Sequence, residues 1–139
     1  MSGEVSEVPS DYLIDLWVPG EPVPKGRPRF AGGRAYTPAR TLDAERRLRD
    51  AVLAMYPSTK PTTGPYELRV DFYVKHRRKR DVDNLAKLVM DSLNNVVWAD
   101  DTQVSHLNAL LHKAGTHSGV PNEAGTRLRI KRRTVNPWA

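Results

Sequence analysis

Apolar and polar side chains alternate in several parts of the chain, which is the pattern of β-strands with one buried face. In the clearest case, residues 67–75, four apolar side chains would share one face: Leu68, Val70, Phe72 and Val74. Residues 12–18 are rich in aromatic and β-branched side chains and stop at a Pro-Gly pair, so they predict a first strand. Residues 104–113 and 126–135 predict two more strands, joined by a loop over residues 114–125.

Two other segments place apolar side chains at helical spacing. The first should begin near Thr37-Pro38, a capping residue followed by proline at the first helical position, and run to about Met55. Its buried stripe would consist of Leu42, Leu48, Ala51, Val52 and Met55. The second should span about residues 83–93, with one apolar side, Leu85, Leu88, Val89 and Leu93, and one polar side, Asp83, Asn84, Lys87 and Asp91. We therefore expect an α+β fold with a small mixed or antiparallel sheet of about four to five strands and two main helices.

The length of 139 residues suits one domain. We expect this single domain to cover residues 1–139, with a flexible segment at 1–10 and a core over about 12–133. No apolar run approaches the roughly 18 residues of a membrane span, and residues 1–10 lack the parts of a secretory signal, so we expect a cytoplasmic protein with no membrane partner. The absence of cysteine excludes disulfides, thiolate nucleophiles and cysteine-based zinc sites.

The formal net charge of +6 favours a polyanionic partner. Residues 20–34 form an irregular basic arm, because prolines and glycines recur along them. The residues predicted to contact DNA phosphates lie in this arm and in a basic run that follows the clearest strand: Lys25, Arg27, Arg29, Lys75, Arg77, Arg78, Lys79 and Arg80. Such a run is also typical of a solvated loop. In the last predicted strand, Leu128 and Ile130 alternate with three basic residues, Arg127, Arg129 and Lys131, which indicates a core face and a basic face.

Acidic residues follow the basic run directly along the chain. Asp81 and Asp83 lie two residues apart, so in an extended segment their side chains would point the same way. If the short apolar segment at residues 96–98 lies against the neighbouring strand, Asp100 or Asp101 would approach this pair. Clustered carboxylates repel one another unless a cation lies among them, and oxygen ligands suit Mg²⁺ or Mn²⁺ better than zinc. The segment therefore predicts a metal site for phosphodiester hydrolysis.

Simpler structural roles explain the same residues. Asp83 and Asn84 are good helix caps, Asp100-Asp101 is a common turn pair, and Asp81 could pair with Arg77 or Arg80. Lys87 could merely pair with Asp83 or Asp91 at helical spacing. Zinc is disfavoured, because the nearest histidine pair, His112 and His117, is split between a predicted strand and a loop.

Two blocks of the sequence resemble the RusA family of Holliday-junction resolvases. One is the proline- and arginine-rich segment GEPVPKGRPR at residues 20–29. The other is DVDNLAK at residues 81–87, and it continues through Asp91-Ser92-Leu93 to Asp100-Asp101-Thr102-Gln103 and Lys113. The matching blocks cover about residues 18–113, and a chance match to the whole ordered set is improbable.

This resemblance implies an α+β homodimer that makes paired, Mg²⁺- or Mn²⁺-dependent nicks in a four-way DNA junction during recombination and repair. It places the acids Asp81, Asp83 and Asp101 at the metal site, with Asp100 as a further candidate ligand, and gives Lys87 a supporting catalytic role. It implies no small-molecule cofactor, and Asp91 is interpreted as a structural partner rather than a ligand. Two alternatives remain: a non-catalytic nucleic-acid-binding module, and a metal-dependent nuclease acting on linear duplex, flaps or RNA.

Overall fold

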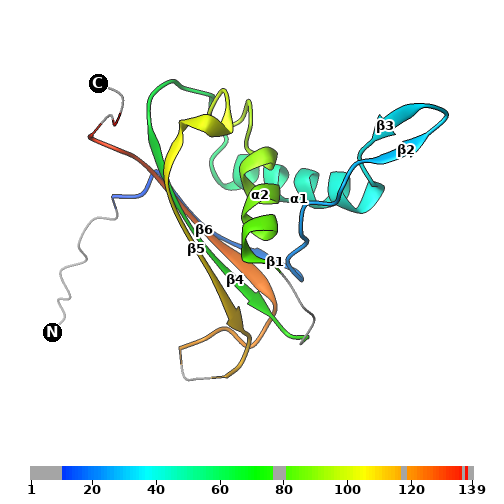
Figure 1. The fold of residues 1–139 in the computed structure, drawn as a ribbon. Coiled ribbons are helices and arrows are strands. Elements are labelled where there is room, and N and C mark those ends of the chain that lie inside the picture. The colour runs from blue at the N-terminus through cyan, green and yellow to red at the C-terminus, as the bar shows by residue number, and fades with distance from the viewer. Residues whose placement is uncertain (1–10, 77–80, 117–118, 136, 138–139) are drawn as a thin grey trace, which may run out of the picture.

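The protein, in a computed structural model, is described over residues 11–76, 81–116, 119–135 and 137. In this part of the chain the main sheet has four strands, β1 (Ile14–Pro19), β4 (Tyr66–Val74), β5 (Val104–Lys113) and β6 (Gly125–Arg132). Two α-helices, α1 (Ala39–Met55) and α2 (Val82–Ser92), lie on one side of the sheet (Figure 1). The smaller elements are a hairpin of β2 (Arg29–Ala31) and β3 (Arg34–Tyr36) and a short 3-10 helix, η1 (Asp101–Gln103).

The sheet is mixed, with the strand order β1-β6-β4-β5. β6 pairs antiparallel with both β1 and β4, whereas β4 and β5 run parallel. Parallel neighbours need a crossover connection, and the chain supplies it with α2 and η1 between β4 and β5. The predicted α+β class, mixed sheet and two main helices are confirmed.

The core lies between the sheet and the two helices. The predicted apolar face of β4 is buried, with Leu68 and Val70 fully so, and β6 adds the buried Leu128 and Ile130. α2 covers this face with the side predicted for it, including Leu85 and Val89. The alternating pattern therefore predicted the buried faces of both central strands correctly.

The predicted apolar stripe of α1 is partly wrong. Leu42 and Met55 are 46% and 62% exposed, while Thr41 and Ala44 are buried. The side chains that α1 buries therefore form a different stripe from the predicted one. The basic arm packs on the first turn of α1, where the Thr41 hydroxyl accepts a hydrogen bond from the Gly26 amide. The predicted helix start is off by one residue, because Pro38 occupies the N-cap position in place of Thr37.

The arm is less irregular than predicted, since its second half forms the hairpin. Gly32 and Gly33 have φ angles of 57° and 77°, and this pair of left-handed residues gives the tight turn that joins two short strands. Phe30 pairs with Ala35 across the hairpin. Figure 1 shows the hairpin projecting away from the sheet and the helices.

The other face of the sheet is charged but largely neutralised. The three basic side chains predicted on β6 each meet a carboxylate from a neighbouring strand: Arg127 with Asp15, Arg129 with Asp71 and Lys131 with Glu67. Because these cations already have partners within the fold, their ion pairs explain the basic face of β6, and no contact with DNA is needed to account for it.

Within the described residues, no helix is long and apolar enough to cross a membrane.

Candidate active site

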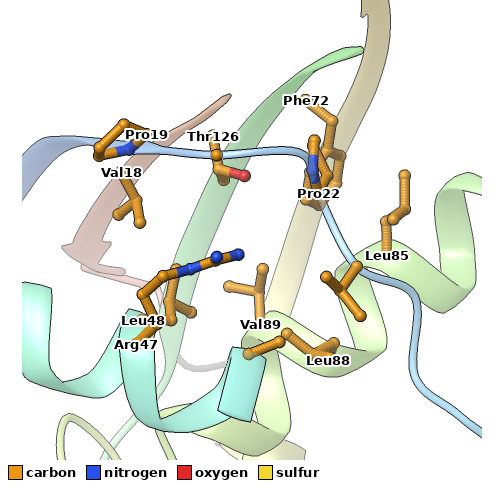
Figure 2. Close-up of a pocket in the computed structure, with 13 residues that line it drawn as sticks. Val18, Pro19, Pro22, Arg47, Leu48, Phe72, Leu85, Leu88, Val89 and Thr126 are labelled. Atoms are coloured by element: carbon orange, nitrogen blue, oxygen red, sulfur yellow. The ribbon is translucent and has the colours of Figure 1, made fainter. Parts of the chain in front are cut away.

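The basic arm is fixed over the junction of the sheet and the helices before it reaches the charged residues. Gly20 has a φ of 112°, and its amide donates to the Ala124 carbonyl. Figure 2 shows the segment from Pro19 to Pro22 passing above apolar side chains of both helices, with Arg47 reaching beneath it. The space enclosed there is about 20 Å³, room for about one water molecule, so this is a packed seam and not a ligand site.

Lys25 joins the arm to both helices. Its amide donates to the Asn84 carbonyl at 3.0 Å. Its ammonium lies 2.8 Å from Glu45 of α1 and 3.0 Å from Asp91 of α2. Burial lowers the pKa of Lys25, but the hydrogen bonds to Glu45 and Asp91 outweigh burial and hold this pKa above its ordinary value. These contacts favour a positioning role for Lys25, and the predicted phosphate contact stays a prediction.

Asp91 and Asp101 are in direct contact. A hydrogen bond links their carboxyl groups, and Lys87 lies 3.3 Å from Asp91 and 3.7 Å from Asp101. Burial and the Asp91 carboxylate raise the pKa of Asp101, whereas the hydrogen bonds from Asp101 and Lys25 outweigh burial and lower that of Asp91. Of the two acids, Asp101 is therefore the one that takes up a proton more readily.

The segment between α2 and β5 brings Asp101 back to the helix. Trp98 is fully buried, and its indole donates to the Met90 carbonyl. The segment pairs with the connector before β4 and not with the sheet, as the Thr62 amide donates to the Val97 carbonyl. Gln103 then fixes the turn: its amide group donates to the Thr62 and Gly64 carbonyls, and its oxygen accepts from the Ala99 and Asp100 amides. The predicted contact of residues 96–98 with a neighbouring strand is therefore wrong, and the turn brings Asp101 to Asp91 rather than to Asp81 and Asp83.

The structure does not gather all the predicted ligands. Asp81 is the N-cap residue of α2, Asp83 lies in its first turn, and both are exposed. Asp83 accepts a hydrogen bond from the Asn84 amide, the next residue along the chain, and the N-cap of α2 has no side-chain cap hydrogen bond. Asp91 lies eight residues further on, about 12 Å along the helix axis. Among the described residues, no three His, Asp or Glu side chains form a group that could hold a metal ion.

Lys87 lies between the two sets of acids. It is four residues from Asp83 and four from Asp91 on the same helix, and its ammonium lies 3.3 Å from Asp91. Its ammonium also contacts Asp101, which comes from η1. Asp100, next to Asp101, is exposed and accepts a hydrogen bond from the Thr102 hydroxyl. The ammonium of this exposed lysine thus links Asp91 of α2 to Asp101 of the turn.

The donor chemistry fits a hard divalent cation. Mg²⁺ in proteins is commonly held by one or two carboxylates, with waters and substrate phosphates completing its coordination. Asp91 and Asp101 bring two carboxyl groups close together, and the negative charge of Asp91 raises the pKa of Asp101, a repulsion that a bound cation would relieve. The site therefore has the ligands that Mg²⁺ or Mn²⁺ prefers.

Of the predicted DNA-contacting residues, the structure places Lys25, described above, and Arg27, Arg29 and Lys75. Lys75 is exposed just after β4. Arg27 and Arg29 line a hollow of about 300 Å³ at the base of the hairpin, together with Arg40. Arg77, Arg78, Lys79 and Arg80 lie outside the described residues, as does His117.

Two features of this region were missed in the sequence. Glu45 of α1 contacts Lys25 of the arm, and no local pattern in the sequence indicated that contact. The exposed aromatic side chains of the hairpin, Phe30 and Tyr36, were also overlooked. Aromatic residues within a segment rich in arginine and glycine were the signal that could have identified them.

The candidate site lies within a segment that matches a known protein family. The family model described as Endodeoxyribonuclease RusA matches residues 19–130, which includes the arm, both helices and η1. A curated relative from Shigella sonnei, the crossover junction endodeoxyribonuclease RusA, is 35% identical over 75 residues. That match covers 53% of this chain and 55% of the relative, so the chain spans about half the length of the curated relative it matches. The extent of the family match shows that this chain belongs to the RusA family of endodeoxyribonucleases.

Proposed function

We propose that this protein is a structure-selective DNA endonuclease that resolves four-way junctions by paired, metal-dependent nicks. The observation that carries the proposal is the contact of Asp101 with Asp91 and Lys87, at the base of a basic arm. Family membership supports it, and the relative bears the name of a crossover junction endodeoxyribonuclease. A DNA-processing enzyme of this kind would act in the cytoplasm.

The proposed metal ligands are Asp81, Asp83 and Asp101, with Asp100 and Asp91 beside Asp101. A bound Mg²⁺ or Mn²⁺ would polarise the phosphoryl oxygen and favour hydroxide as the attacking group. Lys87 is half exposed and contacts Asp91 and Asp101, so its ammonium can stabilise the negative charge that develops on the phosphate. Lys25 would hold Asp91 in place through its ion pair.

The basic segments would bring the DNA backbone to these acids. An acidic site repels a polyanion, and cationic contacts to flanking phosphates overcome that repulsion. Arg27, Arg29 and Arg40 surround one hollow, and Lys75 marks the start of the basic run that leads directly to Asp81. We therefore assign phosphate contacts to Arg27, Arg29 and the run at residues 75–80.

A four-way junction and a linear duplex of the same sequence test the function directly. With Mg²⁺ or Mn²⁺ we expect paired, symmetric nicks confined to the junction, and with a chelator no cutting. Binding to the junction should persist in the chelator and weaken steeply with salt, because Lys and Arg contacts release counterions. Binding without nicking would support a non-catalytic module, and equal cutting of linear duplex or RNA would overturn junction selectivity.

We also propose that the enzyme is a homodimer formed through β5. A two-fold dimer would present two equivalent sites to a junction of approximate two-fold symmetry. β5 is an edge strand of ten residues, and in the described structure no strand pairs with its outer side. On this edge Leu107 and Leu111 are 43% and 42% exposed. Such an edge invites pairing with another chain.

The order of residues on β5 suits a second copy of the same strand. Leu107 and Leu111 lie two residues to either side of Ala109. Antiparallel pairing about a two-fold axis at Ala109 therefore places Leu107 of one copy opposite Leu111 of the other, on the same face of the joined sheet. Two apolar pairs would then close the exposed edge.

Charged substitutions at these positions test the dimer. Leu107→Lys alone should shift the protein from dimer to monomer in light scattering, because it buries a charge against leucine. Leu107→Lys combined with Leu111→Glu should restore the dimer, since each new lysine then faces a new glutamate. Met55→Lys, at an exposed apolar position of α1, is the matched control and should stay dimeric. A dimer that survives Leu107→Lys would place the interface elsewhere.

A further inference from the structure

The hairpin of β2 and β3 presents an aromatic side chain that the fold itself does not use. Phe30 is 77% exposed, the largest exposed fraction among the large apolar side chains of the described residues. All six residues of the two strands are exposed. Burying a phenylalanine stabilises a protein by about 1.5–3 kcal/mol, and this one forgoes that gain. A side chain so exposed on a projecting hairpin indicates contact with a partner.

The charge around Phe30 identifies the chemistry of that partner. No acidic residue occurs between Glu21 and Asp43, whereas this interval holds five basic ones: Lys25, Arg27, Arg29, Arg34 and Arg40. A purely basic segment is complementary to a polyanion and would repel another copy of itself. Aromatic side chains within basic segments bind nucleic acids by stacking on bases that have lost a neighbour.

The geometry of the hairpin leaves the phenylalanine ring free to stack. Phe30 is opposite Ala35, whose methyl group is too small to cover an aromatic ring. Arg29 is opposite Tyr36, and strand alternation places this pair on the other face of the hairpin. One face of the hairpin therefore offers the uncovered ring of Phe30, while the neighbouring Arg29 carries positive charge that can bind the DNA backbone.

The base of the hairpin is tied to the candidate active site. Lys25 is bound to Asp91 and to the Asn84 carbonyl, and Gly26 is held on α1 by the Thr41 hydroxyl. A β-carbon at Gly26 would lie 2.6 Å from that hydroxyl oxygen, so the arm can pass this closely only with glycine. Phe30 follows Lys25 by five residues, a reach of at most about 18 Å. At 3.4 Å per nucleotide, the ring can reach a base about five nucleotides from the site.

We propose that Phe30 stacks on a base at the branch point of the DNA junction, within about five nucleotides of the scissile phosphate, and thereby favours branched over linear DNA. In a linear duplex every base is stacked on both sides, and opening a step costs free energy. At a branch point the strands diverge and a base face can be exposed at lower cost. This proposal rests on the proposed junction endonuclease and names the residue that reads the branch.

The experiment measures the affinity of the full chain for a four-way junction and for a linear duplex, both in chelator so that no cutting occurs. Phe30→Ala should weaken junction binding about 5- to 150-fold, the loss expected for one base-stacking contact, and leave duplex binding unchanged. Phe30→Trp should restore junction binding because it keeps an aromatic face. Phe30→Leu should not, because it keeps only apolar bulk. Met55→Ala, another exposed apolar position, is the control and should behave as wild type.

The failures of this proposal can be told apart from failure of the proposed function. Equal junction affinity of wild type and Phe30→Ala overturns stacking, and junction cutting by the wild type would then still support the endonuclease. Full affinity of Phe30→Leu shows a plain apolar contact and also overturns stacking. Conversion of Phe30→Ala to a monomer in light scattering would show that the hairpin binds a second copy. A wild type that prefers no junction and cuts none overturns both proposals.

Discussion

Replacing Asp83 with Asn is expected to abolish DNA cleavage, by at least about 100-fold, while junction affinity in chelator stays close to that of wild type. Asp83 is exposed, and the hydrogen bond that it accepts from the Asn84 amide can equally be accepted by an asparagine oxygen. The substitution therefore removes the negative charge of a proposed metal ligand and keeps this contact. Cleavage is measured as nicks in a labelled junction with Mg²⁺ or Mn²⁺.

Asp43→Asn is the matched control for this result. Asp43 is an exposed helical acid, 74% exposed, whose ion pair with Arg46 spans 3.7 Å. We expect its cleavage rate to equal that of wild type. A second measurement does not depend on activity: Mn²⁺ should raise the melting temperature of the wild type, because a ligand that binds only the folded state stabilises it, and this increase should shrink in Asp83→Asn. Cutting by Asp83→Asn at the wild-type rate would remove Asp83 from the site.

Removing the carboxylate of Asp71 is expected to cause the largest loss of stability, about 3–5 kcal/mol for Asp71→Ala. The Asp71 side chain is 3% exposed and accepts hydrogen bonds from His112 at 2.9 Å and from Arg69 and Arg129 at 3.3 Å. Arg129 is itself mostly buried, and its Nε already has no hydrogen-bond partner among the described residues. Alanine at position 71 would leave this guanidinium uncompensated inside the fold.

Urea unfolding measures this loss, and Asp15→Ala provides the comparison. Asp15 forms a two-pronged ion pair with Arg127 near the edge of the sheet, but both side chains are about a third or more exposed. An exposed pair of this kind contributes about 0–1 kcal/mol. We therefore expect Asp71→Ala to be far less stable than Asp15→Ala. Similar losses in the two variants would mean that burial of Asp71 adds nothing to its ion pairs.

The contribution of Asp71 should also depend on pH in a defined direction. Burial raises the pKa of Asp71, but the hydrogen bonds from His112 and Arg69, with the charge of Arg129, outweigh burial and hold the pKa below its ordinary value of 3.8. A carboxyl group with a lowered pKa in the folded state stabilises the protein above its unfolded pKa, and that stabilisation is lost as the pH falls through the folded pKa. The difference in unfolding free energy between wild type and Asp71→Ala should therefore be constant above about pH 5 and shrink below pH 3.8. A difference that stays constant down to pH 2 would contradict this assignment.

Much of the fold could be predicted from the sequence because its signals are local. The alternation over β4 and β6 and the helical spacing of α2 depend only on which neighbouring residues share a face. Such patterns predicted the four strands of the main sheet, the two helices and the buried faces of β4, β6 and α2, with ends off by up to three residues. The ordered acids from Asp81 to Asp101, with Lys87 between them, carried the resemblance to the family that the chain is now shown to belong to.

The tertiary structure decided which charged groups meet, because those contacts join residues distant along the chain. Asp101 reaches Asp91 only because the buried Trp98 and the Gln103 side chain fold the intervening segment back onto α2. Lys25 finds Glu45 and Asp91 only because the arm packs between two helices.

The same reason explains Asp71 and the hairpin. The alternation over residues 67–75 predicted that Asp71 lies on the polar face of its strand. Asp71 is buried only because the neighbouring strands bring Arg129 and His112 against it. Glycine and proline predicted an irregular arm, yet two adjacent left-handed glycines allow short strands to pair and carry Phe30 away from the body. Local sequence thus determined the elements and the chemistry available to the site, and the packing between elements decided which side chains meet and which remain exposed to a partner.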